Sequence, residues 1–153
     1  MQMATEIPKP NSALKRLERL VGTWIIEGRT LDSKDNNASG RVSIDWLPGG
    51  FFLQQRGEIE VRGFKVYGLE IIGYDPAKDI FPSHVFSNVG EVPARYYWDV
   101  QGDVVTHWTE GAKYTGRFSE DGNVLSGGWR PDEGVESTSG NTYDATMTRV
   151  KQT

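Results

Sequence analysis

The chain contains no cysteine, so disulfide bonds, thiolate metal sites and a cysteine nucleophile are all excluded. Histidine is nearly as scarce, with only His84 and His107 present. Two separated histidines without cysteine do not make a transition-metal ligand set. We therefore expect no metal site and no cofactor.

The sequence also lacks a long apolar run. No stretch approaches the ~18 apolar residues of a membrane-spanning helix, and residues 1–11 lack the apolar core of a signal peptide. The formal net charge of −4 argues against a large phosphate-binding surface. We expect a cytoplasmic protein that binds neither nucleic acid nor a membrane.

Familiar catalytic motifs are missing as well. The chain has no Gly-x-Ser-x-Gly nucleophile elbow, no His-Glu-x-x-His zinc motif and no phosphate-binding glycine loop followed by Lys and Ser or Thr. The sequence therefore indicates no particular reaction, and any function must come from the way side chains meet in the fold.

Glycine and the aromatic residues, in contrast, are plentiful. The 153 residues include 18 glycines, five tryptophans, six tyrosines and six phenylalanines. The aromatic residues imply a substantial core or a lined cavity. The glycines are scattered between short apolar runs, which is typical of tight turns rather than of a flexible linker.

One short helix is expected near the N-terminus. Residues 1–10 contain Pro8 and Pro10 and should be an extended lead-in, after which Asn11 or Ser12 can cap a helix. The apolar residues that follow have helical spacing: Leu14, Leu17, Leu20 and Val21. The pattern predicts an amphipathic helix of about two to three turns that lies on an apolar surface.

Beyond Gly22 the spacing of the apolar residues changes from helical to alternating, which predicts strands. The candidate strands are 23–31, 40–47, 51–60, 64–74, 80–88, 94–101, 103–110, 113–119, 123–130 and 142–150. Turn sequences such as Gln101-Gly102-Asp103 separate them. About ten strands joined by hairpins predict an all-β antiparallel meander, either two packed sheets or, as we favour, a closed up-and-down barrel formed by residues 11–153 as one domain.

The helix, the Gly22-Thr23-Trp24 segment and Arg149 in the last strand together resemble the calycin barrels: lipocalins, fatty-acid-binding proteins, avidins and nitrobindins. In those families the tryptophan lies at the closed end of the barrel and a basic side chain from the last strand crosses it. The resemblance therefore implies structural roles for Gly22, Trp24 and Arg149. A guanidinium can stack on an indole ring while it donates to helix carbonyls, so the arrangement is physically sound.

A closer resemblance covers most of the chain, from about Leu14 to Val150. Segments such as Leu47-Pro48-Gly49-Gly50-Phe51-Phe52-Leu53 and Glu110-Gly111-Ala112-Lys113-Tyr114-Thr115-Gly116 resemble a family of bacterial lipocalin-like barrels known only as a domain of unknown function. This resemblance supports the barrel and implies no activity.

The hairpin formed by strands 51–60 and 64–74 holds most of the candidate site. If Val61-Arg62-Gly63 is a three-residue turn, Gln54 lies opposite Glu70 and Arg56 lies beside Gly68. These polar residues then share one face of the hairpin, which points either to solvent or into the barrel. A register shift of one residue would reverse the faces.

The candidate ligand-binding residues combine this face with the aromatic strands 94–101 and 103–110. They are Gln54, Arg56, Glu70, Tyr97, Trp98 and Trp108. A barrel of ten strands encloses enough room for a small ligand, so we favour a protein that binds a small apolar or aromatic molecule in its lumen.

Other functions remain open at this point. A cofactor-free isomerase or lyase would use Glu70 or His84 for proton transfer, with Arg56 or Tyr74 stabilising charge, and requires a carboxyl group with a raised pKa. Haem ligation by His84 or His107, as the nitrobindin resemblance implies, is less favoured than an ordinary strand histidine. An assembly protein would use its outer aromatic residues to form a homodimer.

Overall fold

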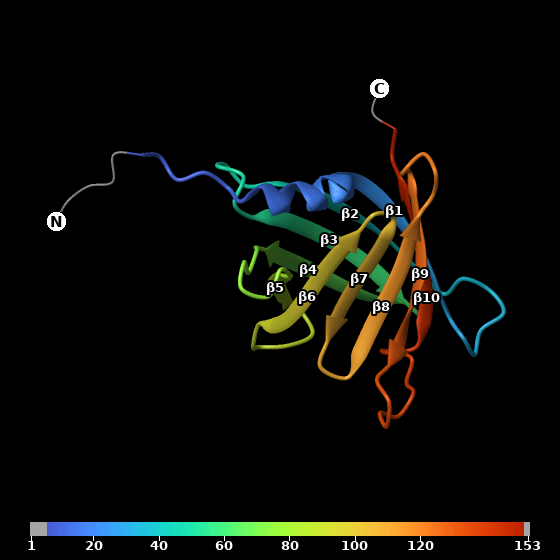
Figure 1. Ribbon diagram of the computed structural model, residues 1–153. Helices are drawn as coiled ribbons and strands as arrows, with labels where there is room; N and C mark the ends of the chain where they lie inside the picture. The colour runs from blue at the N-terminus through green and yellow to red at the C-terminus, as the bar shows by residue number, and fades with distance from the viewer. Residues whose placement is uncertain (1–5, 152–153) are drawn as a thin grey trace.

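A computed structural model describes residues 6–151 as a short helix followed by a closed barrel of ten antiparallel strands (Figure 1). The elements are η1 (Ser12–Leu20), β1 (Gly22–Thr30), β2 (Ala38–Trp46), β3 (Leu53–Val61), β4 (Phe64–Ile72), β5 (Phe81–Ser87), β6 (Ala94–Gln101), β7 (Val104–Thr109), β8 (Ala112–Phe118), β9 (Val124–Pro131) and β10 (Tyr143–Arg149). Each strand begins and ends within two residues of its predicted bounds. The fold class expected from the alternating pattern is confirmed.

Each strand pairs with its neighbours in the chain, and β1 pairs with β10 to close the barrel. Because the chain reverses at every hairpin, its connections alternate between the two ends. Figure 1 shows η1 across one end, which is therefore closed, while the long β1–β2 and β9–β10 loops lie at the other end. We call that open end the mouth. Within the described residues, no helix is long and apolar enough to cross a membrane.

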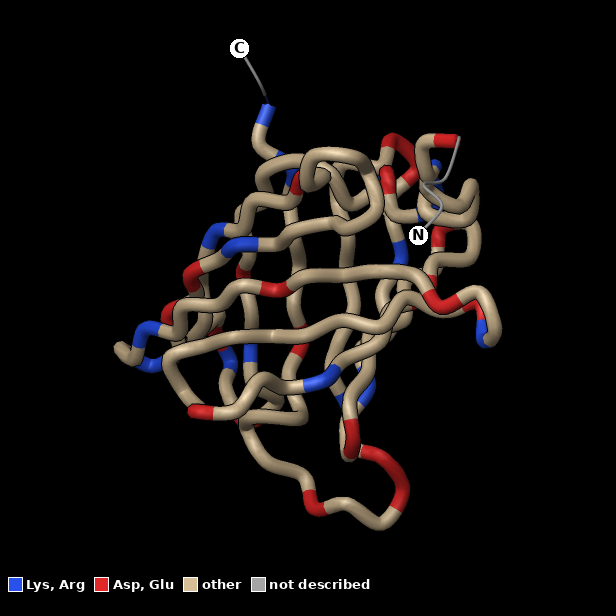
Figure 2. The backbone as a smooth tube through the Cα atoms, turned by 90° about the vertical axis from the view of Figure 1, so that its left-hand side faces the viewer, with Lys and Arg blue, Asp and Glu red and all other residues tan. Residues whose placement is uncertain are grey.

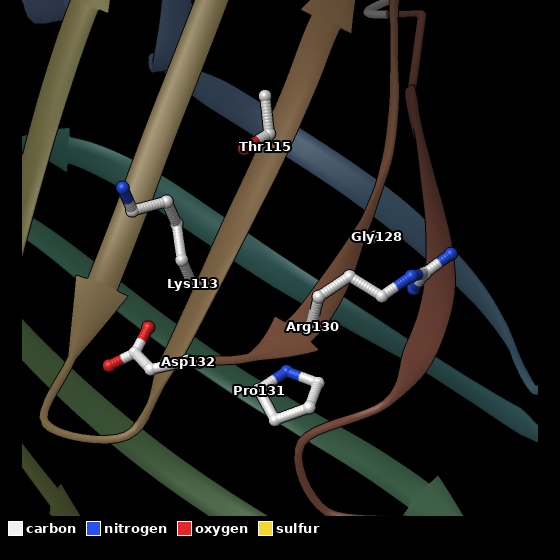
Figure 3. Close-up of a pocket in the computed structure, with 6 residues that line it drawn as sticks. All are labelled: Lys113, Thr115, Gly128, Arg130, Pro131 and Asp132. Carbon is white, nitrogen blue, oxygen red and sulfur yellow. The ribbon is translucent and has the colours of Figure 1, made fainter. Parts of the chain in front are cut away.

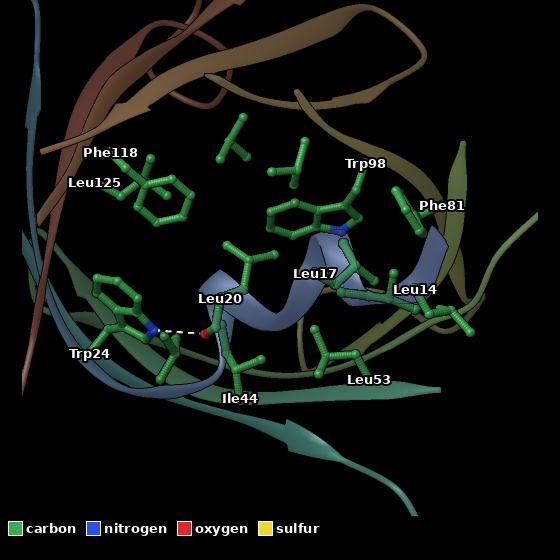
Figure 4. Packing of buried hydrophobic residues seen from close by; sticks show 14 residues of the cluster. Leu14, Leu17, Leu20, Trp24, Ile44, Leu53, Phe81, Trp98, Phe118 and Leu125 are labelled. Atoms are coloured by element: carbon green, nitrogen blue, oxygen red, sulfur yellow. Dashed lines mark hydrogen bonds between the residues drawn. The ribbon is translucent and has the colours of Figure 1, made fainter. Parts of the chain in front are cut away.

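The nine-residue helix η1 is a 3₁₀ helix, and Asn11 caps it by accepting from the Ala13 amide at 2.9 Å. Its apolar side begins a core that continues down the barrel (Figure 4). Leu14, Leu17 and Leu20 are buried against residues from the surrounding strands. The amphipathic pattern thus forms a plug of apolar side chains at the closed end. The expected lead-in, residues 1–10, lies only partly within the described residues, and residues 6–10 contain no regular structure.

Trp24 is fully buried at this closed end. Its indole N–H donates to the Leu20 carbonyl at 2.9 Å, as Figure 4 shows. The Arg149 guanidinium lies 4.2 Å from the centre of the indole ring and donates to the carbonyls of Arg19, at 2.8 Å, and Val21. Gly22 has a φ of +138°, and a side chain there would strike Arg149. This arrangement joins the helix to the first and last strands.

The turn between β3 and β4 has two residues rather than the three that were expected. Arg62 and Gly63 have φ angles of +50° and +85°, and Val61 pairs directly with Phe64. Positive φ at both central positions is the geometry of a two-residue type I′ turn, whose twist matches that of the flanking strands. The expected register was therefore wrong by one residue, and Gln55 rather than Gln54 lies opposite Glu70.

Candidate functional site

The one-residue change of register separates the polar residues of the β3–β4 hairpin. Glu70 is 3% exposed and points into the barrel, together with Gln55 from the neighbouring strand. Gln54 and Arg56 alternate with the inward residues Leu53 and Gln55, so they lie on the outer wall. The expectation that Gln54, Arg56 and Glu70 share one face was wrong, and Arg56 is not the partner of Glu70.

The aromatic strands divide in the same way. Trp98 is buried and points inward. Tyr97 and Trp108 are partly exposed and stack on each other on the outer wall, with ring centres 5.6 Å apart. Of the six candidate ligand-binding residues, the structure therefore brings only Glu70 and Trp98 together in the lumen.

Glu70 lies at the centre of a hydrogen-bond network inside the barrel. One carboxylate oxygen, Oε2, accepts from the Ser83 hydroxyl at 2.6 Å and from the Trp98 indole N–H at 2.7 Å. The other, Oε1, accepts from the Gln55 amide at 3.1 Å. His107 Nε2 lies 3.4 Å from Oε2. The donors come from β3, β5, β6 and β7, so closure of the barrel assembles the site.

These contacts determine the charge of Glu70. Burial alone raises the pKa of a carboxyl group, because a charge is costly away from water. Here the nearby His107 imidazole and the hydrogen bonds from Ser83 and Trp98 outweigh burial, so the pKa of Glu70 lies below its ordinary value of 4.5. Glu70 is therefore an ionised carboxylate at neutral pH.

His107 is held by two contacts. Its ring stacks on Trp98 with a centre-to-centre distance of 3.7 Å and an interplanar angle of 15°. Its Nε2 atom is buried and has no well-aligned hydrogen-bond partner among the described residues, with the Glu70 carboxylate nearest at 3.4 Å. No described residue hydrogen-bonds to Nδ1. Unlike Nε2, this atom is not fully buried, so it is open to the lumen. With the Nε2 proton directed at the carboxylate, a neutral His107 presents Nδ1 as an acceptor.

His84 takes no part in this site. It is exposed on the outer wall, and its Nε2 lies 3.3 Å from the Arg95 guanidinium. His84 and Glu70 therefore lie on opposite sides of the barrel wall. The described residues include no group of three or more His, Asp or Glu side chains that could hold a metal ion.

Glu70 borders a continuous row of aromatic side chains on the inner wall, and His107 is a member of this row. The row crosses five adjacent strands, β6 to β10, and each member pairs in register with the next: Trp98, His107, Tyr114, Trp129 and Tyr143. Tyr96 lies beside it, 5.1 Å from His107 and 6.1 Å from Trp129 between ring centres. We call these six residues the aromatic wall.

The opposite half of the barrel combines inward glycines with aliphatic side chains. One inward glycine lies on each of four neighbouring strands: Gly28, Gly40, Gly57 and Gly68. Several inward residues on the mouth side of the core stay partly exposed: Ile26, Ile59, Val66, Val85, Tyr96, Trp129, Tyr143 and Ala145. These residues are therefore reached by solvent, whereas buried apolar side chains fill the end beneath η1.

Two further depressions lie outside the lumen. One, of about 390 Å³, is formed by Lys113, Thr115, Gly128, Arg130, Pro131 and Asp132 on the outer wall of β8 and β9 (Figure 3). Arg130 in this depression already pairs with Asp144 at 2.7 Å. The second, of about 320 Å³, surrounds Arg149 at the closed end. Neither depression contains the network around Glu70.

The sequence analysis missed His107 as a partner of Glu70, and it missed the aromatic wall. Two turns contained the necessary signal. A two-residue turn at Gly102-Asp103 pairs Trp98 with His107, and a turn at Glu110-Gly111 pairs His107 with Tyr114. Ser83 and Gln55 could not be found in this way, because their approach to Glu70 depends on the register of three strands.

Comparison with known proteins supports the fold and gives the family. The crystal structure of Rv2717c from M. tuberculosis superimposes with a TM-score of 0.63 at 15% sequence identity, over 94% of this chain and 100% of that one. At this identity the similarity concerns the fold alone. No curated protein sequence matches the chain. The model of a family described as "Protein of unknown function (DUF1579)" matches residues 9–121, and the chain therefore belongs to the DUF1579 family.

Proposed function

We propose that this protein binds a small, largely apolar or aromatic molecule in its lumen, between the aromatic wall and the glycine-bearing half of the barrel. The observation that carries the proposal is His107, an inward side chain fixed by Trp98 and Glu70 whose Nδ1 atom opens into the lumen. Binding sites of this kind combine apolar walls with a few fixed polar groups that orient the ligand.

Two features of the lumen favour ligand binding over a purely structural role for its inward residues. The inner surface on the mouth side is partly exposed, although its residues are aromatic or aliphatic. The buried hydroxyl of Tyr114 has no hydrogen-bond partner among the described residues. Buried polar groups are normally paired, so this hydroxyl, which lies against Gly116, is a polar group of the inner wall left without a partner.

The isomerase or lyase hypothesis has less support. It requires a carboxyl group with a raised pKa, whereas the pKa of Glu70 is lowered by His107 and its hydrogen bonds despite burial. A strongly stabilised carboxylate is a weak proton acceptor. The other suggested base, His84, lies on the outer wall.

The proposal can be tested by filling the lumen. Ala145 points inward from β10, next to Gly28 and Gly127, whereas its neighbour Thr146 is exposed on the outer wall. Ala145→Trp is expected to reduce binding of a neutral, environment-sensitive dye by about tenfold or more, because the indole takes up ligand space. Thr146→Trp, the same change on the opposite face, should leave dye binding unaltered.

Thermal unfolding of both variants completes the test. If the lumen is open, the indole in Ala145→Trp enters free space and the melting temperature stays within a few degrees of wild type. If the lumen is packed, overfilling costs about 1–3 kcal/mol or more, and the proposal fails. Equal dye binding by the two variants would place the dye outside the lumen and would also overturn it.

A further inference from the structure

Almost all charged residues of the strands, acidic and basic alike, face outward. Eight of the nine strand lysines and arginines alternate with inward residues and so face outward: Arg29, Arg41, Arg56, Lys65, Arg95, Lys113, Arg117 and Arg130. The ninth, Arg149, is held over Trp24 at the closed end. All ten strands lie within the described residues, and Glu70 is the only acidic residue in them that points inward. The inner face of the strands therefore has one buried carboxylate, and no lysine or arginine faces the open part of the lumen.

The surrounding wall is suited to positive charge. Aromatic ring faces attract cations, and aromatic cages are a common means of binding organic ammonium groups. Tyr96 and Trp129 provide partly exposed rings close to His107, and Tyr143 stacks on Trp129. Burial and the negative charge of Glu70 both raise the pKa of Tyr96, so the lumen disfavours an anion at this position.

The mouth of the barrel carries a net negative charge, like the buried carboxylate of the inner face. Its five connecting segments, 31–37, 62–63, 88–93, 110–111 and 132–142, contain seven acidic residues against two basic ones. The acids are Asp32, Asp35, Glu91, Glu110, Asp132, Glu133 and Glu136. In Figure 2 the long loop at the bottom of the molecule carries red segments and no blue ones. A negative entrance raises the local concentration of cations and repels anions.

From these observations we infer that the ligand of the lumen is a small organic cation, an aromatic or aliphatic amine whose protonated nitrogen donates to His107 Nδ1 and lies against the aromatic wall. The inference rests on the proposed function and specifies its ligand class. Glu70 acts through His107, because its oxygens are already occupied by Ser83, Trp98 and Gln55. In the neutral imidazole, a proton on Nε2 faces this carboxylate 3.4 Å away, and Nδ1 is then the acceptor.

Four probes with one aromatic body test the ligand class: phenethylamine, 2-phenylethanol, phenylacetate and phenethyltrimethylammonium. Calorimetric titration of the wild-type protein is expected to give the order amine, then quaternary ammonium, then alcohol, with phenylacetate weakest. The amine should exceed the alcohol by about tenfold, the effect of one favourable charge interaction near a protein surface. The quaternary ion keeps its charge but has no N–H, so the difference between the two cations measures the hydrogen bond to His107.

A matched pair of variants tests the source of the preference. Glu70→Gln removes the inward charge, whereas Glu58→Gln makes the same change on the outer wall of β3, where Glu58 pairs with Lys65 at 3.3 Å. Glu70→Gln is expected to lower the affinity for phenethylamine about tenfold and to leave that for 2-phenylethanol nearly unchanged. Glu58→Gln should change neither. If Glu70→Gln does not fold, the wild-type probe series still decides the inference.

The outcomes separate this inference from the proposed function. Binding of 2-phenylethanol or phenylacetate as tightly as the amine, with loss of that binding in Ala145→Trp, would overturn the cation inference and keep the proposed function. Absence of binding by all four probes at millimolar concentration would overturn both. An amine preference that survives Glu70→Gln unchanged would also overturn the inference, because the charge would then come from elsewhere.

Discussion

Glu70 shows how strongly the surroundings of one side chain determine what it can do. A buried carboxyl group without partners becomes neutral, since desolvation disfavours its charge. Three hydrogen-bond donors and a histidine hold Glu70 in the opposite state. This residue is thus better suited to orient His107 and to carry a fixed negative charge than to accept a proton.

Replacing Glu70 tests this account through stability. In Glu70→Gln the amide cannot accept from all of the donors, so the variant should be less stable than wild type by about 1–3 kcal/mol at pH 7. Because the pKa of Glu70 is lowered in the fold, its contribution is present above the ordinary value of 4.5 and is lost as the pH falls below it. Urea unfolding at a series of pH values measures the difference. A difference that stays constant below pH 4.5 would contradict the ionised state.

Trp24 offers a second test at a single residue. It is fully buried, packs 6.4 Å from Phe118 between ring centres and donates to Leu20. Trp24→Ala should cost about 3–5 kcal/mol, the range for a large core aromatic residue. Trp108→Ala, the same change on the outer wall, should cost clearly less, because Trp108 is already partly exposed. If urea unfolding shows the same loss of unfolding free energy in both variants, Trp24 is not the main contact at the closed end.

Among the elements, the β3–β4 hairpin decides the composition of the site. Its two-residue turn sends Glu70 and Gln55 inward and leaves Gln54 and Arg56 outside. A three-residue turn would have put Gln54 and Arg56 on the same face as Glu70 and Gln55 on the other, since side chains alternate along a strand. The backbone geometry at Arg62 and Gly63 is therefore a condition for the network inside the barrel.

Two glycine replacements isolate the contribution of this turn. A methyl group at Gly63 or at Gly90 would meet nothing within 4 Å, but only Gly63 has a positive φ, of +85°. Gly63→Ala should therefore cost about 1–2 kcal/mol from backbone strain alone. Gly90→Ala, in the β5–β6 loop, should change stability by less than about 0.5 kcal/mol. Thermal unfolding of the two variants compares them directly, and similar losses would rule out a requirement for the type I′ geometry.

For the molecule as a whole, closure of the barrel separates charge from apolar surface in two directions. Across the wall, the strand charges of both signs lie outside, whereas the Glu70 carboxylate lies inside. Along the axis, an apolar plug fills the closed end, while the mouth holds an excess of acidic residues. Together these distributions favour entry of positively charged molecules from the mouth.

The role of the mouth is tested by neutralising three of its exposed acids, Glu91, Glu133 and Glu136, to glutamine. The melting temperature should change little, because these side chains are exposed. Wild-type affinity for phenethylamine should fall several-fold as the salt concentration rises from about 20 to about 300 mM, since salt screens the mouth charges. The triple variant should bind more weakly at low salt and respond less to salt. An identical salt response would show that the mouth does not attract the ligand.

The sequence by itself determined the strands, the helix and the turns, and the resemblance to calycin barrels implied closure and the closed end. Alternating apolar residues define ten strands, the leucines of residues 12–20 define an amphipathic helix, and turn residues mark each reversal. These features depend on neighbours a few positions apart in the chain, so their physical causes are local. Trp98 and Glu70 were named as candidate site residues for similar reasons, as a large aromatic residue and an acid within apolar strands.

Only the tertiary structure decided which side of the wall each candidate faces and which residues meet. A single-residue difference in one turn moved Gln54 and Arg56 outside, and pairing of β6 with β7 brought His107 onto Trp98. Ser83 and Gln55 reach Glu70 because three strands have matching registers. The charge of Glu70 depends on these contacts, since a buried carboxylate keeps its charge only where donors from other strands surround it.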